Sequence, residues 1–196
     1  LALAFAYGDG QKVSAENLCT AVETLLNIPV DEYVVVNRGS LNYLNELAGG
    51  VTVTVPNDDL AVKRPELSKG TTVTLDDTNV YDYLVYRDKQ QAYTNTGRME
   101  RQKEFINAYI AQVKGMLPGG AETLWDRLKK IDDHILTSVT KNKYLDYANL
   151  VSQVEYSEAD FLQPPGTNVE GKKHDEFYVD EEALRQMVVD LFYIEQ

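Results

Sequence analysis

Cysteine is almost absent from this chain of 196 residues, because Cys19 is the only one. A single thiol cannot close an internal disulfide, so the sequence gives no indication of the redox compartment. Histidine is nearly as scarce. His134 and His174 have no cysteine or carboxylate at ligand spacing, which favours packing or surface roles for both over a metal site.

Long apolar runs are also missing. The apolar stretch Leu1–Tyr7 is too short to cross a bilayer and lacks the basic flank of a signal peptide. Because it resembles the end of an amphipathic helix and has no initiating Met, we expect the sequence to be a fragment of a longer protein. Hydrophobic residues make up 43% of the chain, enough to bury one core, so we expect a single domain over 1–196.

Positive charge is the third scarcity. The chain has 19 Lys and Arg against 31 Asp and Glu, a net charge of −12, so no long basic face is available and a nucleic-acid partner is not expected. Residues 85–116 are the exception, with six basic against three acidic side chains, whereas 1–84 has five against twelve and 117–196 has eight against sixteen. This local excess of basic residues predicts one anionic ligand held at one place.

The basic segment continues into a predicted helix over about 98–114. Its apolar residues recur at helical spacing and are Phe105, Ile106, Tyr109, Ile110 and Val113. Extended backwards, the same face runs through Arg98, Arg101 and Gln102, in the first turns, where free N–H groups favour an anion. Because the planar guanidinium donates two parallel hydrogen bonds, this face predicts a phosphate site. The alternative is an ordinary helix entry whose arginines pair with nearby Asp or Glu.

Helical and strand patterns alternate along the chain. The predicted strands are β-branched and short: Tyr33–Asn37, Val51–Val55, Thr71–Leu75 and Glu176–Val179. The other predicted helices have capping residues or helical periodicity: Ser14–Asn27, Leu41–Leu47, Asp76–Tyr86, Ala121–Asp133, Lys141–Gln153 and a last helix capped by Asp180. Residues 57–70 and 161–171 are interpreted as loops. This order predicts a layered α/β domain.

Other polar residues are candidates for a metal-binding or phosphate-binding site. The pairs Asp58-Asp59 and Asp76-Asp77 are interpreted as helix caps in preference to metal ligands. Arg38 follows a predicted strand, where ligands gather in α/β folds, and is a candidate for a further phosphate contact. Tyr86 and Tyr93 lie near the arginines in sequence.

The order of these motifs resembles the LytR-CpsA-Psr family, also called the cell-envelope-related transcriptional attenuator domain. The matching segments cover nearly the whole chain: Ala4–Gly8, Thr20–Val30, Tyr33–Asn37, Leu47–Val53, Lys69–Asp76, Tyr83–Arg87, Gly97–Gln102, Pro165-Gly166 and Phe177–Tyr193. The resemblance implies a layered α-β-α sandwich with a central mixed β-sheet, truncated at the N-terminus. It also implies that 1–117 is the C-terminal portion of the family domain and 118–196 a family-typical extension.

The resemblance also implies a function. Family members stand on the extracytoplasmic face of the membrane, held by an N-terminal anchor, and move a glycopolymer from an undecaprenyl-pyrophosphate carrier to peptidoglycan. By position, Arg87 and Arg98 match the catalytic arginines. The groups that hold the pyrophosphate are matched by four residues: Arg87, Arg98, Arg101 and Gln102. Magnesium is the implied cofactor, with its carboxylate ligands in the N-terminal part that this sequence lacks, so no metal ligand is assigned here.

Two departures weaken the catalytic expectation. Val85 stands where the family has the first arginine of an Arg-x-Arg segment. The N-terminal motifs with further arginines and the magnesium carboxylates are also missing, so we expect the fragment alone to be inactive. The alternative function is a non-catalytic polyprenyl-pyrophosphate-binding or regulatory module. A DNA-binding role is not expected, since no helix-turn-helix or basic face is present.

Overall fold

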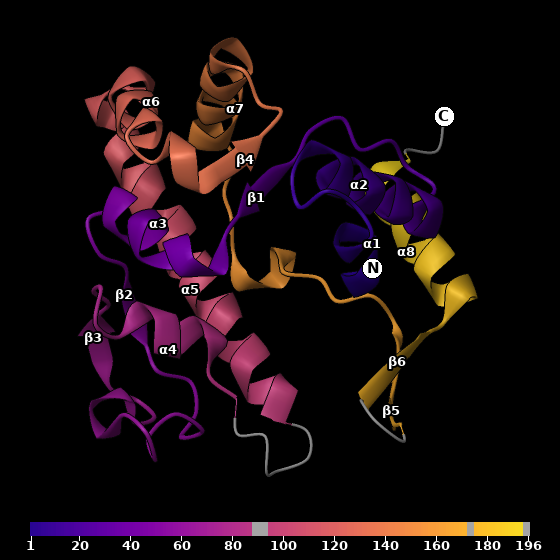
Figure 1. Cartoon of the computed structure of the whole chain (residues 1–196), viewed down its shortest axis with the longest axis horizontal. Helices are drawn as coiled ribbons and strands as arrows, with labels where there is room; N and C mark the ends of the chain where they lie inside the picture. Colours follow the sequence, from indigo (N-terminus) through magenta and orange to yellow (C-terminus); the bar gives the residue numbers. More distant parts are fainter. Residues whose placement is uncertain (88–93, 172–174, 194–196) are drawn as a thin grey trace. The chain divides into compact units, whose positions relative to one another are not determined.

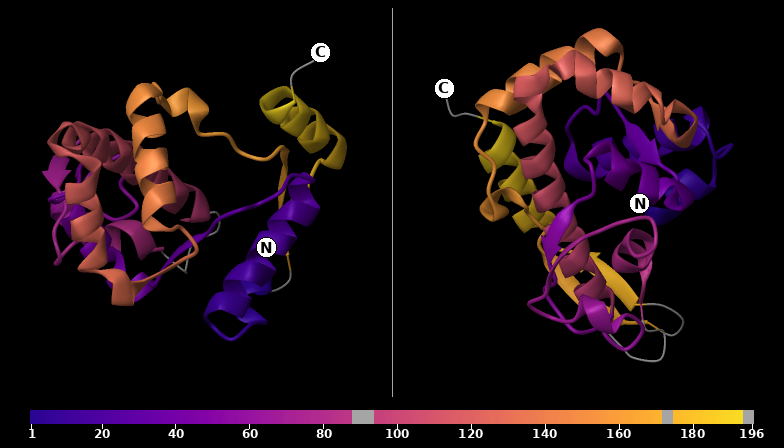
Figure 2. Two further views of the ribbon diagram at one scale, coloured as in Figure 1. Left: turned by 90° about the horizontal axis from the view of Figure 1, so that it is seen from above. Right: turned by 90° about the vertical axis from the view of Figure 1, so that its left-hand side faces the viewer.

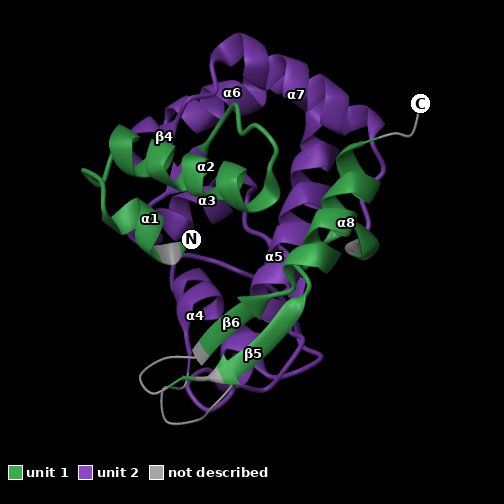
Figure 3. Cartoon of the chain, turned by 90° about the vertical axis from the view of Figure 1, so that its right-hand side faces the viewer, with its two compact units in different colours: residues 1–33, 159–196 green, residues 34–158 purple. Residues whose placement is uncertain are grey.

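The computed structural model describes residues 1–87, 94–171 and 175–193 (Figure 1). The chain divides into two compact units (Figure 3). Unit 1 is built from Leu1–Tyr33 and Ala159–Gln196, and unit 2 from Val34–Glu158. His174 and Tyr93 lie outside the described residues. Within the described residues, no helix is both long and apolar enough to cross a membrane.

A small antiparallel sheet contributes to the hydrophobic core of unit 2. Strand β2 (Thr52–Thr54) pairs with β3 (Thr72–Thr74). The valines that alternate with the threonines turn inward and are almost fully buried: Val51, Val53 and Val55. The threonines turn outward and pair across the strands, with Oγ1 atoms 2.8 Å apart for Thr52 and Thr74. The alternation in the sequence therefore identifies both the strand and its buried face.

Helix α5 (Thr94–Met116) packs along this sheet. Phe105 is buried in the core and Tyr109 packs beside it, with ring centroids 5.8 Å apart. Two polar side chains of the helix bond to the outer edge of β2. The Thr54 N–H donates to Glu104 Oε1 at 3.0 Å, and Gln112 Nε2 donates to the carbonyl of Gly50 at 2.7 Å.

Two shorter helices complete this core, α3 (Leu41–Leu47) and α4 (Val80–Val85). Asn45 on α3 is 2% exposed and connects it to both strands. Its Nδ2 donates to the Leu75 carbonyl at 2.7 Å, and its Oδ1 accepts from the Val51 N–H at 2.8 Å. Buried backbone groups next to the strands thus gain partners from one side chain.

The rest of unit 2 holds β1 (Val34–Val36), β4 (Ile135–Thr137), α6 (Ala121–Lys129) and α7 (Lys141–Gln153). β1 and β4 form a second antiparallel pair. Trp125 on α6 packs against Tyr144 on α7, with ring centroids 5.2 Å apart. Five 3-10 turns connect described elements of the chain: Arg38–Ser40, Pro65–Leu67, Leu117–Gly119, Asp132–His134 and Glu158–Asp160.

Unit 1 contains α1 (Ala2–Ala6), α2 (Lys12–Leu26), the antiparallel pair β5 (Gly166–Glu170) and β6 (Asp175–Val179), and α8 (Glu181–Phe192). The right-hand view of Figure 2 shows the hairpin in orange and yellow. Helix α8 contacts α2, and the apolar residues between them line a cavity of about 1250 Å³.

The predicted α/β class is confirmed, and several elements end where the sequence predicts. Helix α7 begins and ends at the predicted residues, Lys141 and Gln153. Asp180 caps α8 as predicted, because its Oδ1 accepts from the Ala183 N–H at 3.0 Å. The predicted cap at Ser14 is wrong. Helix α2 begins at Lys12, because Asp9 Oδ1 already accepts from the Gln11 N–H at 2.7 Å.

The sheet is organised differently from the expected central mixed sheet. The described strands form three separate two-stranded antiparallel sheets. The strands of unit 2 are only three residues long, which leaves each ladder few hydrogen bonds. Val34 on β1 is 61% exposed, because a two-stranded sheet covers few side chains. The proposed boundary between 117 and 118 remains a prediction.

Candidate anion-binding site

Arg101 is fully buried at the point where α5 crosses the end of α4. Its Nε donates to the Tyr83 carbonyl at 2.9 Å and its Nη2 to the Tyr86 carbonyl at 2.6 Å. Its Nη1 donates to Asn57 Oδ1 at 3.2 Å. Each guanidinium nitrogen therefore has a protein acceptor, and the planar fork of arginine is what lets one side chain reach all three.

Two opposing effects act on the pKa of Arg101. Burial lowers the pKa of its guanidinium, while the carboxylate of Asp59, 3.8 Å from Nη1, opposes that shift. An arginine remains protonated under such a shift. The buried charge also lies against the carbonyl end of α4, where the helix dipole favours a cation.

Gln102, the next residue, holds the same helix end. Its Nε2 donates to the Leu84 carbonyl at 2.9 Å. The last carbonyls of a helix have no partner within the helix, so side chains must supply one when the end is buried. After this cap the chain leaves the helix at Tyr86, with ψ of 135°, and continues to Arg87, which is exposed.

Arg98 lies one turn before Gln102 and is half-buried. Its Nη2 donates to Asn95 Oδ1 at 2.5 Å, but its Nε is buried and has no hydrogen-bond partner in the part of the chain that is described. Burial lowers the pKa of Arg98, and the charges of Arg87 and then Arg38 lower it further. The charges of Arg87 and Arg38 therefore both act on Arg98.

Arg38 reaches this place from the 3-10 turn that follows β1. Its Nη2 donates to the hydroxyl of Tyr81 on α4 at 3.2 Å. Among residues 1–87, 94–171 and 175–193, no carboxylate forms an ion pair with Arg38, Arg87 or Arg98. We call these three the arginine cluster. An unpaired cationic cluster beside the first turns of a helix is a site for an anion with several acceptor oxygens.

The loop after β2 is held against the start of α5. Asn57 Nδ2 donates to the Gly97 carbonyl at 2.9 Å and to Glu100 Oε2 at 2.8 Å. The carboxylate of Asp59 occupies the space beside Gly97, because a Cβ built there would lie 1.7 Å from Oδ2. A larger residue at this helical position would have to displace the Asp59 carboxylate, which explains a glycine here even though glycine is a poor helix former.

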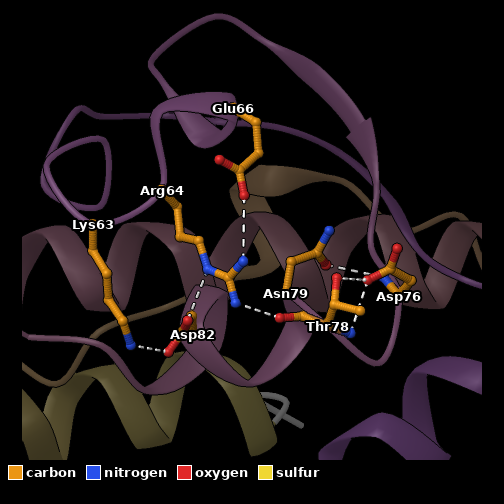
Figure 4. A network of polar contacts seen from close by, with 7 residues as sticks. All are labelled: Lys63, Arg64, Glu66, Asp76, Thr78, Asn79 and Asp82. Atoms are coloured by element: carbon orange, nitrogen blue, oxygen red, sulfur yellow. Dashed lines mark hydrogen bonds and ion pairs between the residues drawn. The ribbon is translucent and has the colours of Figure 1, made fainter.

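A second polar network fixes the other end of α4 (Figure 4). Asp82 accepts from Lys63 Nζ at 2.5 Å and from Arg64 Nε at 2.9 Å. Burial alone would raise the pKa of Asp82, but its two basic partners outweigh burial and lower it. Arg64 Nη2 also donates to the Thr78 carbonyl at 2.5 Å. Lys63 lies over the ring of Tyr86, 5.5 Å from the centroid.

The acidic pairs are held in turns. Asp58 Oδ1 accepts from the Lys69 N–H at 2.7 Å, and Asp76 Oδ1 accepts from the Thr78 N–H at 2.9 Å. Hydrogen bonds from Thr78, the side-chain one first, lower the pKa of Asp76. No group of three His, Cys, Asp or Glu in the described part of the chain could hold a metal ion.

His134 is engaged in packing and hydrogen bonding. Its Nδ1 lies 3.2 Å from Ser40 Oγ, and its ring stacks on Tyr43 with centroids 4.0 Å apart. The charges of Arg38 and Arg87 thus act on Arg98, while Arg101 and Gln102 contact the end of α4. Sequence reasoning missed Asn57. Its position immediately after the strand and Pro56 was the available signal.

Comparisons with known proteins extend this description. The model of the LytR_cpsA_psr family matches residues 1–192. The polyisoprenyl-teichoic acid–peptidoglycan teichoic acid transferase TagU of Bacillus cereus is 28% identical over 169 residues, which cover 84% of this chain and 52% of that protein. TagU of Bacillus subtilis is 27% identical over 175 residues, or 87% of this chain and 54% of that protein. The chain therefore spans about half the length of these curated relatives.

Solved structures agree on the fold. The crystal structure of B. subtilis TagT matches with a TM-score of 0.68 and 21% identity, covering 96% of this chain and 69% of the other. A structure described as TagT bound to LIIa-WTA matches with a TM-score of 0.69 over the same shares, also at 21% identity. At this identity the likeness establishes the fold alone.

Proposed function

This chain belongs to the LytR-CpsA-Psr family, and from that membership we propose that the whole protein transfers a glycopolymer from a polyprenyl-pyrophosphate carrier to peptidoglycan. The observation that carries the proposal is the arginine cluster, in which the buried Arg98 Nε has no hydrogen-bond partner among the described residues. Four matching relatives share the name of a polyisoprenyl-teichoic acid–peptidoglycan transferase.

The cluster suits a pyrophosphate for electrostatic reasons. Burial, and after it the charges of Arg87 and Arg38, disfavour the charged form of Arg98, and a polyanion bound at Arg98 offsets both effects. Each guanidinium can donate two parallel hydrogen bonds to phosphate oxygens. Arg98 is partly desolvated, which strengthens its interaction with a bound oxygen.

The proposed reaction is a phosphoryl transfer. A sugar hydroxyl of peptidoglycan attacks the phosphorus that bears the glycopolymer, the new O–P bond forms, and the bridging P–O bond of the pyrophosphate breaks. The lipid phosphate leaves with the bonding electrons, and the hydroxyl proton is lost. In this scheme Arg87 and Arg98 neutralise the charge that spreads over the transferring group.

Arg101 and Gln102 are the other two family pyrophosphate positions. An amide nitrogen carries two hydrogens, and Gln102 Nε2 donates one to Leu84. We assign the second to a phosphate oxygen. Magnesium, which the family implies, has no ligand cluster among the described residues, and no step above depends on it.

The place of action follows from the same family membership. We propose that the protein works in the cell envelope, on the extracytoplasmic face of the membrane, held there by an N-terminal anchor. Its partners would be the lipid-linked glycopolymer and the peptidoglycan acceptor, with no nucleic acid.

One observation favours a second function. Val85 occupies the family position of an arginine and packs against the core of unit 2, so that phosphate contact is lost. A site with fewer cations still binds a pyrophosphate but stabilises the transition state less. The alternative is therefore a module that binds the lipid carrier without transferring the polymer.

The test uses the full-length protein and its Arg87→Ala and Arg98→Ala variants. We expect each to weaken polyprenyl-pyrophosphate binding about 10-fold or more, the cost of losing a charged hydrogen bond. The exposed Arg185→Ala on α8 makes the same charge change in unit 1 and should leave binding intact. Unchanged binding in both site variants would refute the proposal. Binding without polymer transfer in the unmodified protein would establish the alternative.

A further inference from the structure

The arginine cluster brings like charges together, so its backbone must be held against their repulsion. Arg87 follows α4 on a chain that has already left the helix, and Arg98 stands in the first turns of α5. Burial lowers the pKa of Arg98, and the charge of Arg87 lowers it further. Without restraint, the exposed Arg87 would move away, because separation lowers the Coulomb energy.

The contacts of Arg101 supply that restraint. Its Nη2 donates to the carbonyl of Tyr86, the residue before Arg87. Its Nη1 donates to the side chain of Asn57, and the Asn57 amide in turn donates to the carbonyl of Gly97, the residue before Arg98. A single buried side chain, with one amide as intermediary, thus connects the backbone next to both cluster arginines.

The same contacts exclude Arg101 from touching a ligand. Its side chain is 0% exposed, and Nε, Nη1 and Nη2 each have a protein acceptor. We infer that Arg101 is a positioning residue, which sets the spacing of Arg87 and Arg98 for a pyrophosphate through the carbonyls of α4 and through Asn57. This inference rests on the proposed function, and it assigns Arg101 a role other than the direct phosphate contact predicted from the family.

The shape of the side chain makes the inference testable. A lysine keeps the charge, but its ammonium is one point on a flexible stem and cannot lie in one plane against two carbonyls. If Arg101 acts by charge on the ligand, Arg101→Lys preserves binding. If it acts by geometry, Arg101→Lys loses binding, and the loss operates through Arg87.

The experiment is a double-mutant cycle in the full-length protein. Farnesyl pyrophosphate is the probe, inorganic pyrophosphate the second ligand, and affinity is measured by calorimetry at a temperature well below unfolding. We expect Arg101→Lys to weaken binding about 10-fold in the unmodified background and less than about 2-fold in the Arg87→Ala background. Equal losses in both backgrounds, or no loss in either, would overturn the inference.

A matched control separates positioning from general destabilisation. Arg64→Lys loosens the opposite end of α4, where Arg64 binds Asp82 and the Thr78 carbonyl, and it touches neither cluster arginine. We expect Arg64→Lys to lower the melting temperature without weakening the binding of farnesyl pyrophosphate. If Arg64→Lys weakens binding as much as Arg101→Lys does, the effect comes from stability and the inference fails.

A second variant covers the case in which Arg101→Lys does not fold. Asn57→Ala breaks the connection to Gly97 and should show the same dependence on Arg87. Amide hydrogen exchange gives a readout without ligand: Arg101→Lys should speed exchange at Arg87. If Arg87→Ala and Arg98→Ala both leave binding unchanged, the proposed function fails, and this exchange measurement alone then decides the inference.

Discussion

Arg98 and Arg101 are three residues apart on one helix face, yet their replacement by methionine should change stability in opposite directions. Methionine keeps a long unbranched side chain and helix propensity while removing the charge and the donors. Arg98 carries an unpartnered buried Nε and lies near like charges, whereas every guanidinium nitrogen of Arg101 has an acceptor. We expect Arg98→Met to stabilise the free protein and Arg101→Met to destabilise it.

The magnitudes follow from the contacts. Arg98→Met removes a buried donor without a partner, worth about 1–3 kcal/mol, and loses the bond to Asn95, worth about 1 kcal/mol. Relief of repulsion adds to the gain, so the free energy of unfolding should rise by about 1 kcal/mol. Arg101→Met leaves the carbonyls of Tyr83 and Tyr86 without these donors, and at about 1–3 kcal/mol each the loss should be about 3 kcal/mol.

The assay is denaturant unfolding without ligand, followed by the fluorescence of Trp125. This residue is the single tryptophan of the chain, and it packs against Tyr144 inside unit 2, so its signal reports on the unit that holds both arginines. The two variants should differ by about 4 kcal/mol, far beyond the error of linear extrapolation. A clear loss of stability in Arg98→Met would refute the reasoning, because it would mean that Arg98 is paired in the free protein.

Four further changes can be measured by the same unfolding assay or by a thermal melt. Gly97→Ala should lose about 1–3 kcal/mol despite its better helix propensity, because the new methyl group meets the Asp59 carboxylate; neutral behaviour would contradict the packing argument. Asn45→Ala should lose about 2–5 kcal/mol, since two buried backbone groups are left without partners. Asp82 has a lowered pKa in the folded state, so it stabilises the fold above its unfolded pKa of about 3.9, and this stabilisation is lost as pH falls through the folded pKa. In Asp82→Asn, the free energy of unfolding should therefore depend less on pH in the acid range. Asp180→Ala should destabilise α8 by about 1 kcal/mol, measured by circular dichroism because this helix lies outside the unit reported by tryptophan.

The sequence predicted local structure well where a pattern repeats. The alternation of valine and threonine identified β2 and its buried face, and the helical spacing placed Arg101 on the inward side of α5. It also predicted the basic segment as the site of a bound anion, a prediction that the unpaired arginine cluster supports without testing it directly.

Long-range pairing could not be predicted in the same way. β1 pairs with β4, a strand about a hundred residues away and only three residues long, and no periodicity develops over three residues. The acceptors of the Arg101 hydrogen bonds could not be predicted from the sequence either. An inward-facing arginine has the same sequence signature whether it binds a ligand or the carbonyls of a neighbouring helix, and only the position of Asn57 and α4 decides between them.

The contacts between α5 and the outer edge of β2 have a consequence for assembly. The outward N–H of Thr54 is taken by the Glu104 carboxylate, and that of Thr52 lies 3.5 Å from Gln112 Oε1. An open edge of this kind would otherwise be a template on which another chain could add a strand. The helix therefore takes the place of a neighbouring strand, and its side chains protect this edge of the β2–β3 sheet from intermolecular pairing.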